Sequence, residues 1–308
     1  MRNEKREMND LQNKILALKE EKGALILAHY YQTMDVQEIA DHVCDSFEMA
    51  RLAREAKKNM LVICGVRFMA ESAKILNPGK TVLLPSPGAG CPMADMIAPG
   101  DVTALRKKYP DAAVVCYVNS SAAVKAVSDV CCTSSSAIKI VRSLPSMQII
   151  FVPDRNLGAY VASRAPEKKI ILFDGCCPAH DRVTENDAIA AKERRPGVKL
   201  LVHPECRMEV LRHADYIGST AGIIKEALES PAAEFVIGTE IGVIERLEAL
   251  APEKEFYPLR SGFLCADMKK TGLRDIYNAL DRGGFEITLG QDEIEAAARS
   301  LERMVALG

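Results

Sequence analysis

Short aliphatic and β-branched runs alternate along the chain with longer amphipathic segments. We expect the short runs to form strands at residues 24–27, 60–64, 81–84, 113–118, 148–152, 169–173, 198–202 and 234–237. Helix-length segments such as 36–58 and 186–194 separate them, and residues 3–22 and 291–307 predict flanking helices. Strands that alternate with helices predict parallel sheets covered by helices on both faces, so we expect an α/β fold.

Polar residues recur along the chain at nearly constant intervals. An aspartate is followed five positions later by a hydroxyl residue in three segments: Asp41 to Ser46, Asp129 to Ser134, and Asp215 to Thr220. The hydroxyl residues are 88 and then 86 positions apart, while Cys91, Cys177 and Cys265 are 86 and then 88 positions apart. An apolar run that ends in polar residues also recurs, at 25–31, 114–119 and 200–205. A period of this length predicts three similar αβα three-layer domains.

We expect a flanking helix over residues 1–22, αβα domains over 23–100, 101–184 and 185–270, and a C-terminal helical segment over 271–308. Ligands of parallel sheets bind beyond the carboxyl ends of the strands. The polar residues of all three repeats fall at that edge. The repeat therefore predicts a centre that three copies of one unit share.

Composition and charge narrow the class of partner. The chain has 308 residues, 48% of them hydrophobic, with a net charge of −2, so it can bury a large core and has no general attraction to nucleic acid or anionic membranes. No apolar run reaches the roughly 18 residues of a membrane span, and the charged N-terminus lacks the apolar core of a signal peptide. We expect a cytoplasmic protein with small-molecule partners. Ten cysteines in that compartment favour thiols or metal ligands over disulfides.

The three periodic cysteines differ from the others. Cys44, Cys64, Cys116 and Cys206 lie in or beside apolar segments and are expected to be buried as small hydrophobic residues. Cys91, Cys177 and Cys265 lie in loops flanked by Gly or Pro at the same stage of each repeat. Soft thiolates select zinc, copper(I) or iron–sulfur clusters. A closed zinc site could recruit His180, but a [4Fe–4S] cluster with three cysteines leaves one iron open as a Lewis acid, and we favour the cluster.

Several segments resemble the quinolinate synthase family, the A protein of NAD biosynthesis. The resemblance runs from about residue 11 to the C-terminus and is carried by AHYYQ (28–32), CDSF (44–47), FMAESAKILNP (68–78), YVNS (117–120), FVPDRNL (151–157), HPEC (203–206), GST (218–220) and KEFYP (254–258). It implies condensation of iminoaspartate with dihydroxyacetone phosphate, with loss of phosphate and two waters. It further implies three αβα domains in a pseudo-threefold arrangement around one [4Fe–4S] cluster per chain. It also implies an aspartate oxidase or dehydrogenase as the donor of iminoaspartate.

The resemblance and the residue chemistry together suggest roles. Cys91, Cys177 and Cys265 would hold the cluster, with Cys177 preferred to Cys176 by the spacing and by the family pattern up to His180. Anionic groups of the substrates would bind Ser46, Ser134, Ser219 and Thr220 at expected helix starts, where free N–H groups and a hydroxyl form an anion site. Ordinary helix caps are the alternative. The expected catalytic residues are Tyr31, Tyr117, His203 and Glu205, and the expected substrate-binding residues also include His29, Asn119 and His180.

Two other functions stay open on the sequence alone. Another [4Fe–4S] hydro-lyase would share the open iron but would not consume a phosphate ester. A non-enzymatic iron–sulfur sensor or electron carrier usually has four cysteine ligands and no need for three anion sites, so the sequence argues against it.

Overall fold

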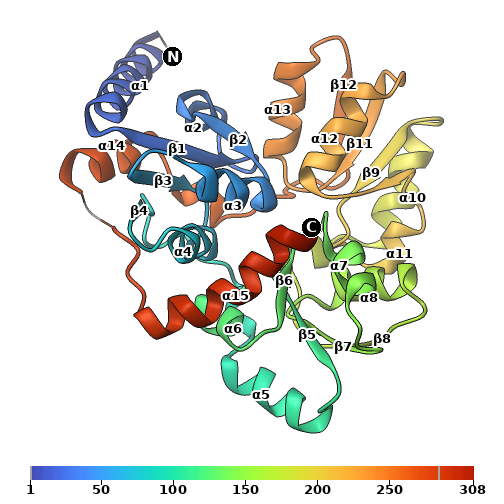
Figure 1. The fold of residues 1–308 in the computed structure, drawn as a ribbon. Helices are drawn as coiled ribbons and strands as arrows, with labels where there is room; N and C mark the ends of the chain where they lie inside the picture. The colour runs from blue at the N-terminus through green and yellow to red at the C-terminus, as the bar shows by residue number, and fades with distance from the viewer. Residues whose placement is uncertain (1, 284) are drawn as a thin grey trace.

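Three parallel sheets of four strands form the framework in a computed structural model of the chain (Figure 1). The structure describes the backbone of residues 2–283 and 285–308, and the side chains of residues 9–283 and 285–308. The strand orders are β2-β1-β3-β4, β6-β5-β7-β8 and β10-β9-β11-β12. Each sheet therefore has the same order relative to its first strand, which is the repeat that the sequence predicts. The proposed domain boundaries themselves stay a prediction.

We call each sheet with its neighbouring helices a unit. The first unit contains α1 (Arg2–Lys22), β1 (Ala24–His29), α2 (Met34–Ile39), β2 (His42–Cys44), α3 (Ser46–Glu55), β3 (Met60–Cys64), α4 (Arg67–Leu76) and β4 (Thr81–Leu83). The second contains α5 (Pro99–Lys108), β5 (Ala113–Tyr117), α6 (Ala122–Ala126), β6 (Val130–Cys132), α7 (Ala137–Ser143), β7 (Gln148–Val152), α8 (Arg155–Arg164) and β8 (Lys169–Leu172).

The third unit contains α9 (Pro178–Asp181), α10 (Glu185–Arg194), β9 (Lys199–Val202), α11 (Met208–Leu211), β10 (Tyr216–Ile217), α12 (Thr220–Glu229), β11 (Glu234–Gly238), α13 (Gly242–Leu250) and β12 (Glu255–Pro258). Short 3₁₀ helices, η1 (Ala94–Met96) and η2 (Met268–Lys270), follow the loops of Cys91 and Cys265. Two helices complete the chain, α14 (Leu273–Arg282) and α15 (Gln291–Leu307).

All eight expected strands are confirmed to within one or two residues at their ends. The expected single helix over 36–58 is wrong, because α2 ends at Ile39 and the short strand β2 precedes α3. Pairing with β1 explains the difference: Leu27 pairs with His42 and His29 pairs with Cys44. A tertiary contact thus overrides the local helical pattern.

The aspartate of each repeat fixes an edge strand to its neighbour. One carboxylate oxygen accepts a backbone N–H from the adjacent strand in all three units: Asp41 from Ile26 at 2.8 Å, Asp129 from Val114 at 2.7 Å, and Asp215 from Leu200 at 2.8 Å. The backbone N–H of each aspartate donates in return to the carbonyl of that partner residue, which is Ile26, Val114 or Leu200. The regular spacing of these aspartates therefore reflects a structural role.

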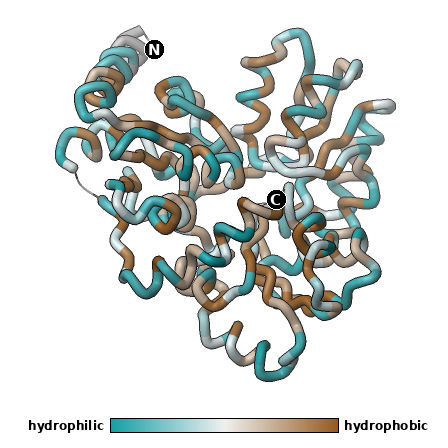
Figure 2. The backbone as a smooth tube through the Cα atoms, in the orientation of Figure 1, coloured by the Kyte–Doolittle hydropathy of each residue, from teal (hydrophilic) through white to brown (hydrophobic). Residues whose placement is uncertain are grey.

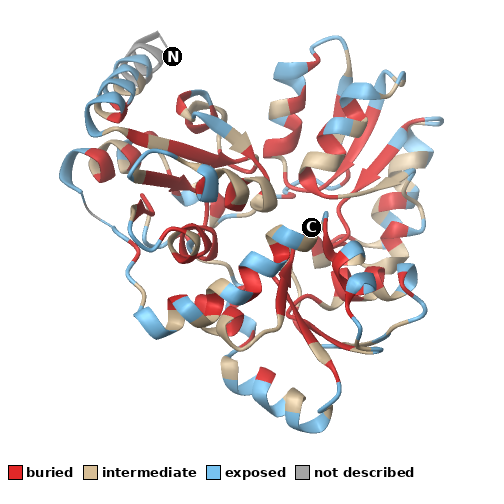
Figure 3. Ribbon diagram, viewed as in Figure 1, coloured by how far each residue is buried: buried red, intermediate tan, exposed pale blue. Residues whose placement is uncertain are grey.

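The strands are buried and the outer helices are amphipathic. Apolar residues concentrate in the strands, while exposed polar residues cover the outward faces of the helices (Figures 2 and 3). The flanking helices are confirmed: α1 and α14 pack on each other beside the first sheet, and α15 packs on α6, β6 and α4. The C-terminus lies near the centre, where the three units meet (Figure 1). Among the described residues, helices with both the length and the apolar character of a membrane span are absent.

Candidate active site

One cavity lies where the units meet, and all three contribute to its wall. Its lining includes every expected site residue except one: Cys91, Cys177, Cys265, His29, Tyr31, Ser46, Tyr117, Asn119, Ser134, His180, His203, Glu205 and Thr220. Ser219 lies outside it, in a neighbouring surface hollow that Asp45 and Ser135 also line.

The three cysteine loops are anchored in the same way. At the start of the helix that follows the third strand of each sheet, a backbone N–H donates to a carbonyl two residues before the cysteine: Arg67 to Ala89 at 2.9 Å, Arg155 to Gly175 at 2.7 Å, and Ile241 to Phe263 at 2.9 Å. A side chain at Gly175 would come within 2.7 Å of the Pro153 carbonyl oxygen, so this loop requires glycine. Cys177 therefore occupies the position equivalent to Cys91 and Cys265, whereas Cys176 is outside the described cavity lining.

These thiols lie in a poorly solvated site. Burial raises the pKa of Cys91 to about 12 and also raises the pKa values of Cys177 and Cys265. Free thiols here would stay protonated, and a bound metal would displace those protons. Cys177, His180 and Glu205 also place one ligand atom each within 4.8 Å of one another, so this group could hold a metal ion. Three soft thiols that open on one cavity fit an iron–sulfur cluster by the chemistry of their donors.

A buried carboxylate joins two histidines beside Cys177. Glu205 Oε2 lies 3.0 Å from Nδ1 of His180 and 3.3 Å from Nδ1 of His203. His180 Nδ1 is also 3.2 Å from the Cys177 sulfur, and His203 Nε2 is 3.2 Å from the Ser134 hydroxyl. The hydrogen bonds therefore connect the second and third units across the cavity.

The charges of this group follow from burial and contact. Burial alone would raise the pKa of Glu205, but the two neighbouring imidazoles and a hydrogen bond from Tyr117 lower it to about 2. Burial lowers the pKa of His180 to about 4 and that of His29 to about 3. Glu205 is then an anion at neutral pH, and an ionised carboxylate can accept a proton.

Tyr31 connects the first unit to the same group through a residue that the sequence did not single out. Its hydroxyl lies 2.7 Å from Oγ1 of Thr239 and accepts a hydrogen bond from Thr220 at 3.1 Å. Thr239 Oγ1 lies in turn 3.0 Å from Nε2 of His180. Burial raises the pKa of Tyr31 well above its usual value. The tyrosine therefore stays protonated and can donate a proton.

Two buried polar atoms of the wall have no hydrogen-bond partner among the described residues. They are Oδ1 of Asn119 and Oε1 of Glu205. Leaving a buried polar atom unpaired costs about 1–3 kcal/mol. Both residues line the cavity, so the two atoms are best explained as contacts for a polar ligand.

The hydroxyl residues correct part of the helix-start prediction. Thr220 and Ser46 are the first residues of α12 and α3, but the caps are Ser219, which accepts from Gly222, and Asp45, which accepts from Phe47 and Glu48. Ser134 lies in the turn that leads into α7, where the N–H of Ala137 donates to the Thr133 carbonyl at 2.9 Å. Hydroxyl contacts of Thr133 with Ser135 and Ser136 hold this turn.

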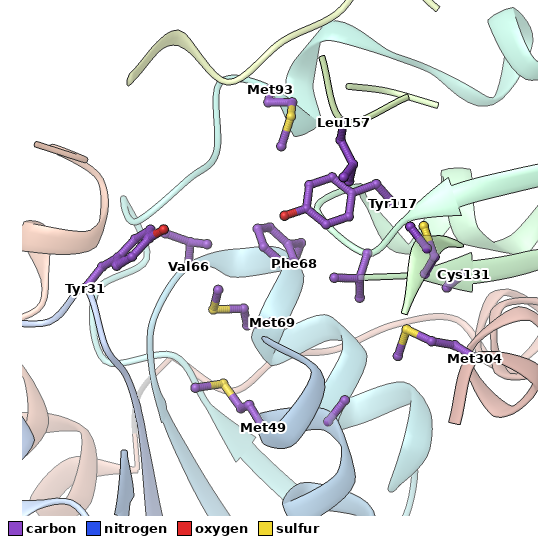
Figure 4. Packing of buried hydrophobic residues seen from close by; sticks show 14 of the residues in the cluster. Tyr31, Met49, Val66, Phe68, Met69, Met93, Tyr117, Cys131, Leu157 and Met304 are labelled. Atoms are coloured by element: carbon purple, nitrogen blue, oxygen red, sulfur yellow. The ribbon is translucent and has the colours of Figure 1, made fainter. Parts of the chain in front are cut away.

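The opposite wall is apolar. Figure 4 shows the Tyr31 and Tyr117 hydroxyl groups pointing into the space between the two rings, beside Val66 and Phe68. Met69, Met93 and Met268 also line the cavity. Sequence reasoning missed these residues because an apolar side chain by itself carries no functional signal. It also missed Glu240, which the repeat could have indicated, since its position matches those of Asp154 and Val66 at intervals of 86 and 88 residues.

Comparison with known proteins agrees with this geometry. Residues 13–306 match the family model described as quinolinate synthetase A protein. The chain belongs to the quinolinate synthetase A protein family. A quinolinate synthase of Caldicellulosiruptor saccharolyticus is 50% identical over 301 residues, 98% of this chain and 99% of the relative. Those of Clostridium kluyveri and Methanoregula boonei are each 50% identical over 297 residues, 96% of this chain and 98% of each relative.

Proposed function

We propose that this quinolinate synthase condenses iminoaspartate with dihydroxyacetone phosphate in the central cavity and releases quinolinate, phosphate and two waters. A [4Fe–4S] cluster, held by Cys91, Cys177 and Cys265 at the centre of the three units, is part of this proposal. When bound, a cluster with an open iron supplies a Lewis acid for dehydration. The observation that carries the proposal is the identical anchoring of three cysteine loops that open on one cavity.

The chain's own residues supply the anion contacts. The substrates together bring two carboxylates and one phosphate, and hydroxyl groups of Ser46, Ser134 and Thr220 enter the cavity from three different units. Hydroxyl donors bind anions by charge-assisted hydrogen bonds. The unpaired Asn119 oxygen accepts from a hydroxyl or imine N–H of the substrate. These contacts orient the two substrates for carbon–carbon bond formation.

Proton transfer is assigned to the hydrogen-bonded group. Glu205 accepts a carbon-bound proton through the oxygen that has no partner, Oε1. His203 and His180, on the other oxygen, hold the carboxylate in place and stabilise the proton once it has arrived. Tyr31 and Tyr117, whose pKa values burial raises, donate protons to departing hydroxyl groups. The apolar wall keeps bulk water away from these steps.

The reaction implies a partner and a compartment. Iminoaspartate would come from an aspartate oxidase or dehydrogenase, and we place the protein in the cytoplasm with no nucleic acid or membrane partner.

An assay of the products tests the proposal. Anaerobically purified protein with iminoaspartate and dihydroxyacetone phosphate should form quinolinate and phosphate in equal amounts. Another [4Fe–4S] hydro-lyase would release no phosphate, and a mononuclear metal at Cys177, His180 and Glu205 would give a protein without iron and sulfide. Either result would reject the proposed function.

A further inference from the structure

Two of the three cysteine loops are held by a buried carboxylate at equivalent positions. Oδ2 of Asp154 accepts the backbone N–H of Cys177 at 3.2 Å, and Oε1 of Glu240 accepts that of Cys265 at 3.4 Å. Asp154 and Glu240 are 86 residues apart and both are fully buried. The equivalent residue of the first unit is Val66, 88 residues before Asp154. The carboxylates are thus a feature of two units only.

The second oxygen of each carboxylate is fixed as well. Asp154 Oδ1 accepts the N–H of Leu157 at 2.8 Å, and Glu240 Oε2 accepts that of Gly242 at 2.7 Å. Both oxygens of each group therefore accept from backbone N–H groups, which favours the ionised carboxylate and opposes the effect of burial, which raises the pKa of both groups. Each side chain ties a cysteine to the start of a rigid helix, so the position of the thiol follows from the helix.

The surroundings of the two carboxylates differ in charge. Glu240 pairs with Lys269 at 3.1 Å. Asp154 has no basic partner among the residues whose side chains the structure describes. The Cys91 loop is held differently, because the N–H of Gly90 donates to Asp267 at 3.3 Å and Asp267 pairs with Lys270 at 2.6 Å.

We propose that Asp154 and Glu240 are positioning residues that hold Cys177 and Cys265 for the cluster and lower its reduction potential. The inference rests on the proposed function. Hydrogen bonds to cluster sulfurs and nearby net charge set the potential of an iron–sulfur centre. Here the cysteine N–H groups donate to carboxylates instead of sulfur, and the carboxylates add negative charge, which disfavours an extra electron. A cluster that serves as a Lewis acid would then stay in one oxidation state.

Isosteric variants test this inference. Asp154→Asn and Glu240→Gln keep the shape but remove the charge and one acceptor oxygen. We expect iron retention against a chelator to fall about 10- to 100-fold, the range for outer-shell partners of metal ligands, and the midpoint potential to rise, more in Asp154→Asn than in the paired Glu240→Gln. Lys269→Met should shift the potential downward, because it leaves Glu240 uncompensated. A purely structural effect would not give shifts of opposite sign.

Glu71→Gln is the matched control. Glu71 is buried and accepts the N–H of Ala122 at 2.9 Å and the Nε–H of Arg67 at 3.0 Å, but it is not a lining residue of the cavity and accepts no hydrogen bond from a cysteine loop. It should retain iron like the parent protein. If Asp154→Asn fails to fold, Glu240→Gln carries the same comparison. Potentials and iron retention equal to the parent in both variants, with the parent holding its cluster, would overturn this inference alone, whereas a parent protein that binds zinc would overturn the proposed function with it.

Discussion

The Tyr31 hydroxyl lies 2.7 Å from Oγ1 of Thr239, a residue 208 positions later in the chain. The same threonine oxygen lies 3.0 Å from His180 Nε2. Thr239 is fully buried and joins a proton donor of the first unit to the histidine–carboxylate group of the third. Its position sets the orientation of both partners.

Replacing Thr239 should slow turnover without removing the metal. Thr239→Val keeps the volume but removes the hydroxyl, so Tyr31 and His180 each lose a buried hydrogen bond. We expect a decrease in kcat of roughly tenfold or more, since about 1.4 kcal/mol corresponds to a factor of ten. Thr239→Ser retains the hydroxyl and should stay close to the parent. Equal kcat values for the Val and Ser variants would exclude the link.

Glu205 is expected to carry proton transfer. Glu205→Gln should lower turnover on the order of 10²-fold or more, the usual contribution of a general acid or base, while cluster content stays unchanged. Tyr31→Phe and His203→Ala should behave similarly. Steady-state kinetics together with iron and sulfide analysis of each variant check this. Near-normal quinolinate formation by Glu205→Gln with an intact cluster would reduce its role to support of His203.

Alanine substitutions of the hydroxyl residues distinguish anion binding from helix capping. Ser46→Ala, Ser134→Ala and Thr220→Ala should each weaken substrate or product binding by about 1–3 kcal/mol, the range for a hydrogen bond to a charged group. Ser219→Ala is the matched control, because Ser219 caps α12 and lies outside the cavity. It should cost about 1 kcal/mol of stability with an unchanged KM. Equal KM values in all four variants would reject the anion contacts.

Asp215, the last of the repeated aspartates, should contribute to stability in a pH-dependent way. Burial opposes ionisation of Asp215, but hydrogen bonds from Leu200 and Lys192 lower its pKa in the folded state. Its contribution is then fully present above the unfolded pKa of about 3.9 and is lost as pH falls through the folded pKa. We expect Asp215→Asn to cost about 1–3 kcal/mol near neutral pH and progressively less in acid, measured by urea unfolding. A cost independent of pH would contradict this.

The sequence predicted the repeating framework but not all of its parts. The strands β3 and β7 are apolar runs that the sequence pattern reveals. By contrast, β2 and β10 have only three and two residues, and they form because they pair with β1 and β9. The cysteine loops could be predicted because Cys91, Cys177 and Cys265 recur at nearly equal intervals of 86 and 88 residues. The turn around Ser134 could not be predicted in detail, since it depends on contacts among Thr133, Ser135 and Ser136. Thr239 acts through contacts with distant residues, which no local pattern encodes.

The central claim is that Cys91, Cys177 and Cys265 together hold one iron–sulfur cluster. The most direct test is the iron and sulfide content of anaerobically prepared protein, with its visible absorption spectrum, for the parent and single alanine variants. We predict about four irons and four sulfides per chain, loss of the cluster in Cys91→Ala, Cys177→Ala and Cys265→Ala, and retention in Cys176→Ala. One zinc per chain without visible absorption, or a cluster that survives in Cys177→Ala but not in Cys176→Ala, would contradict the account.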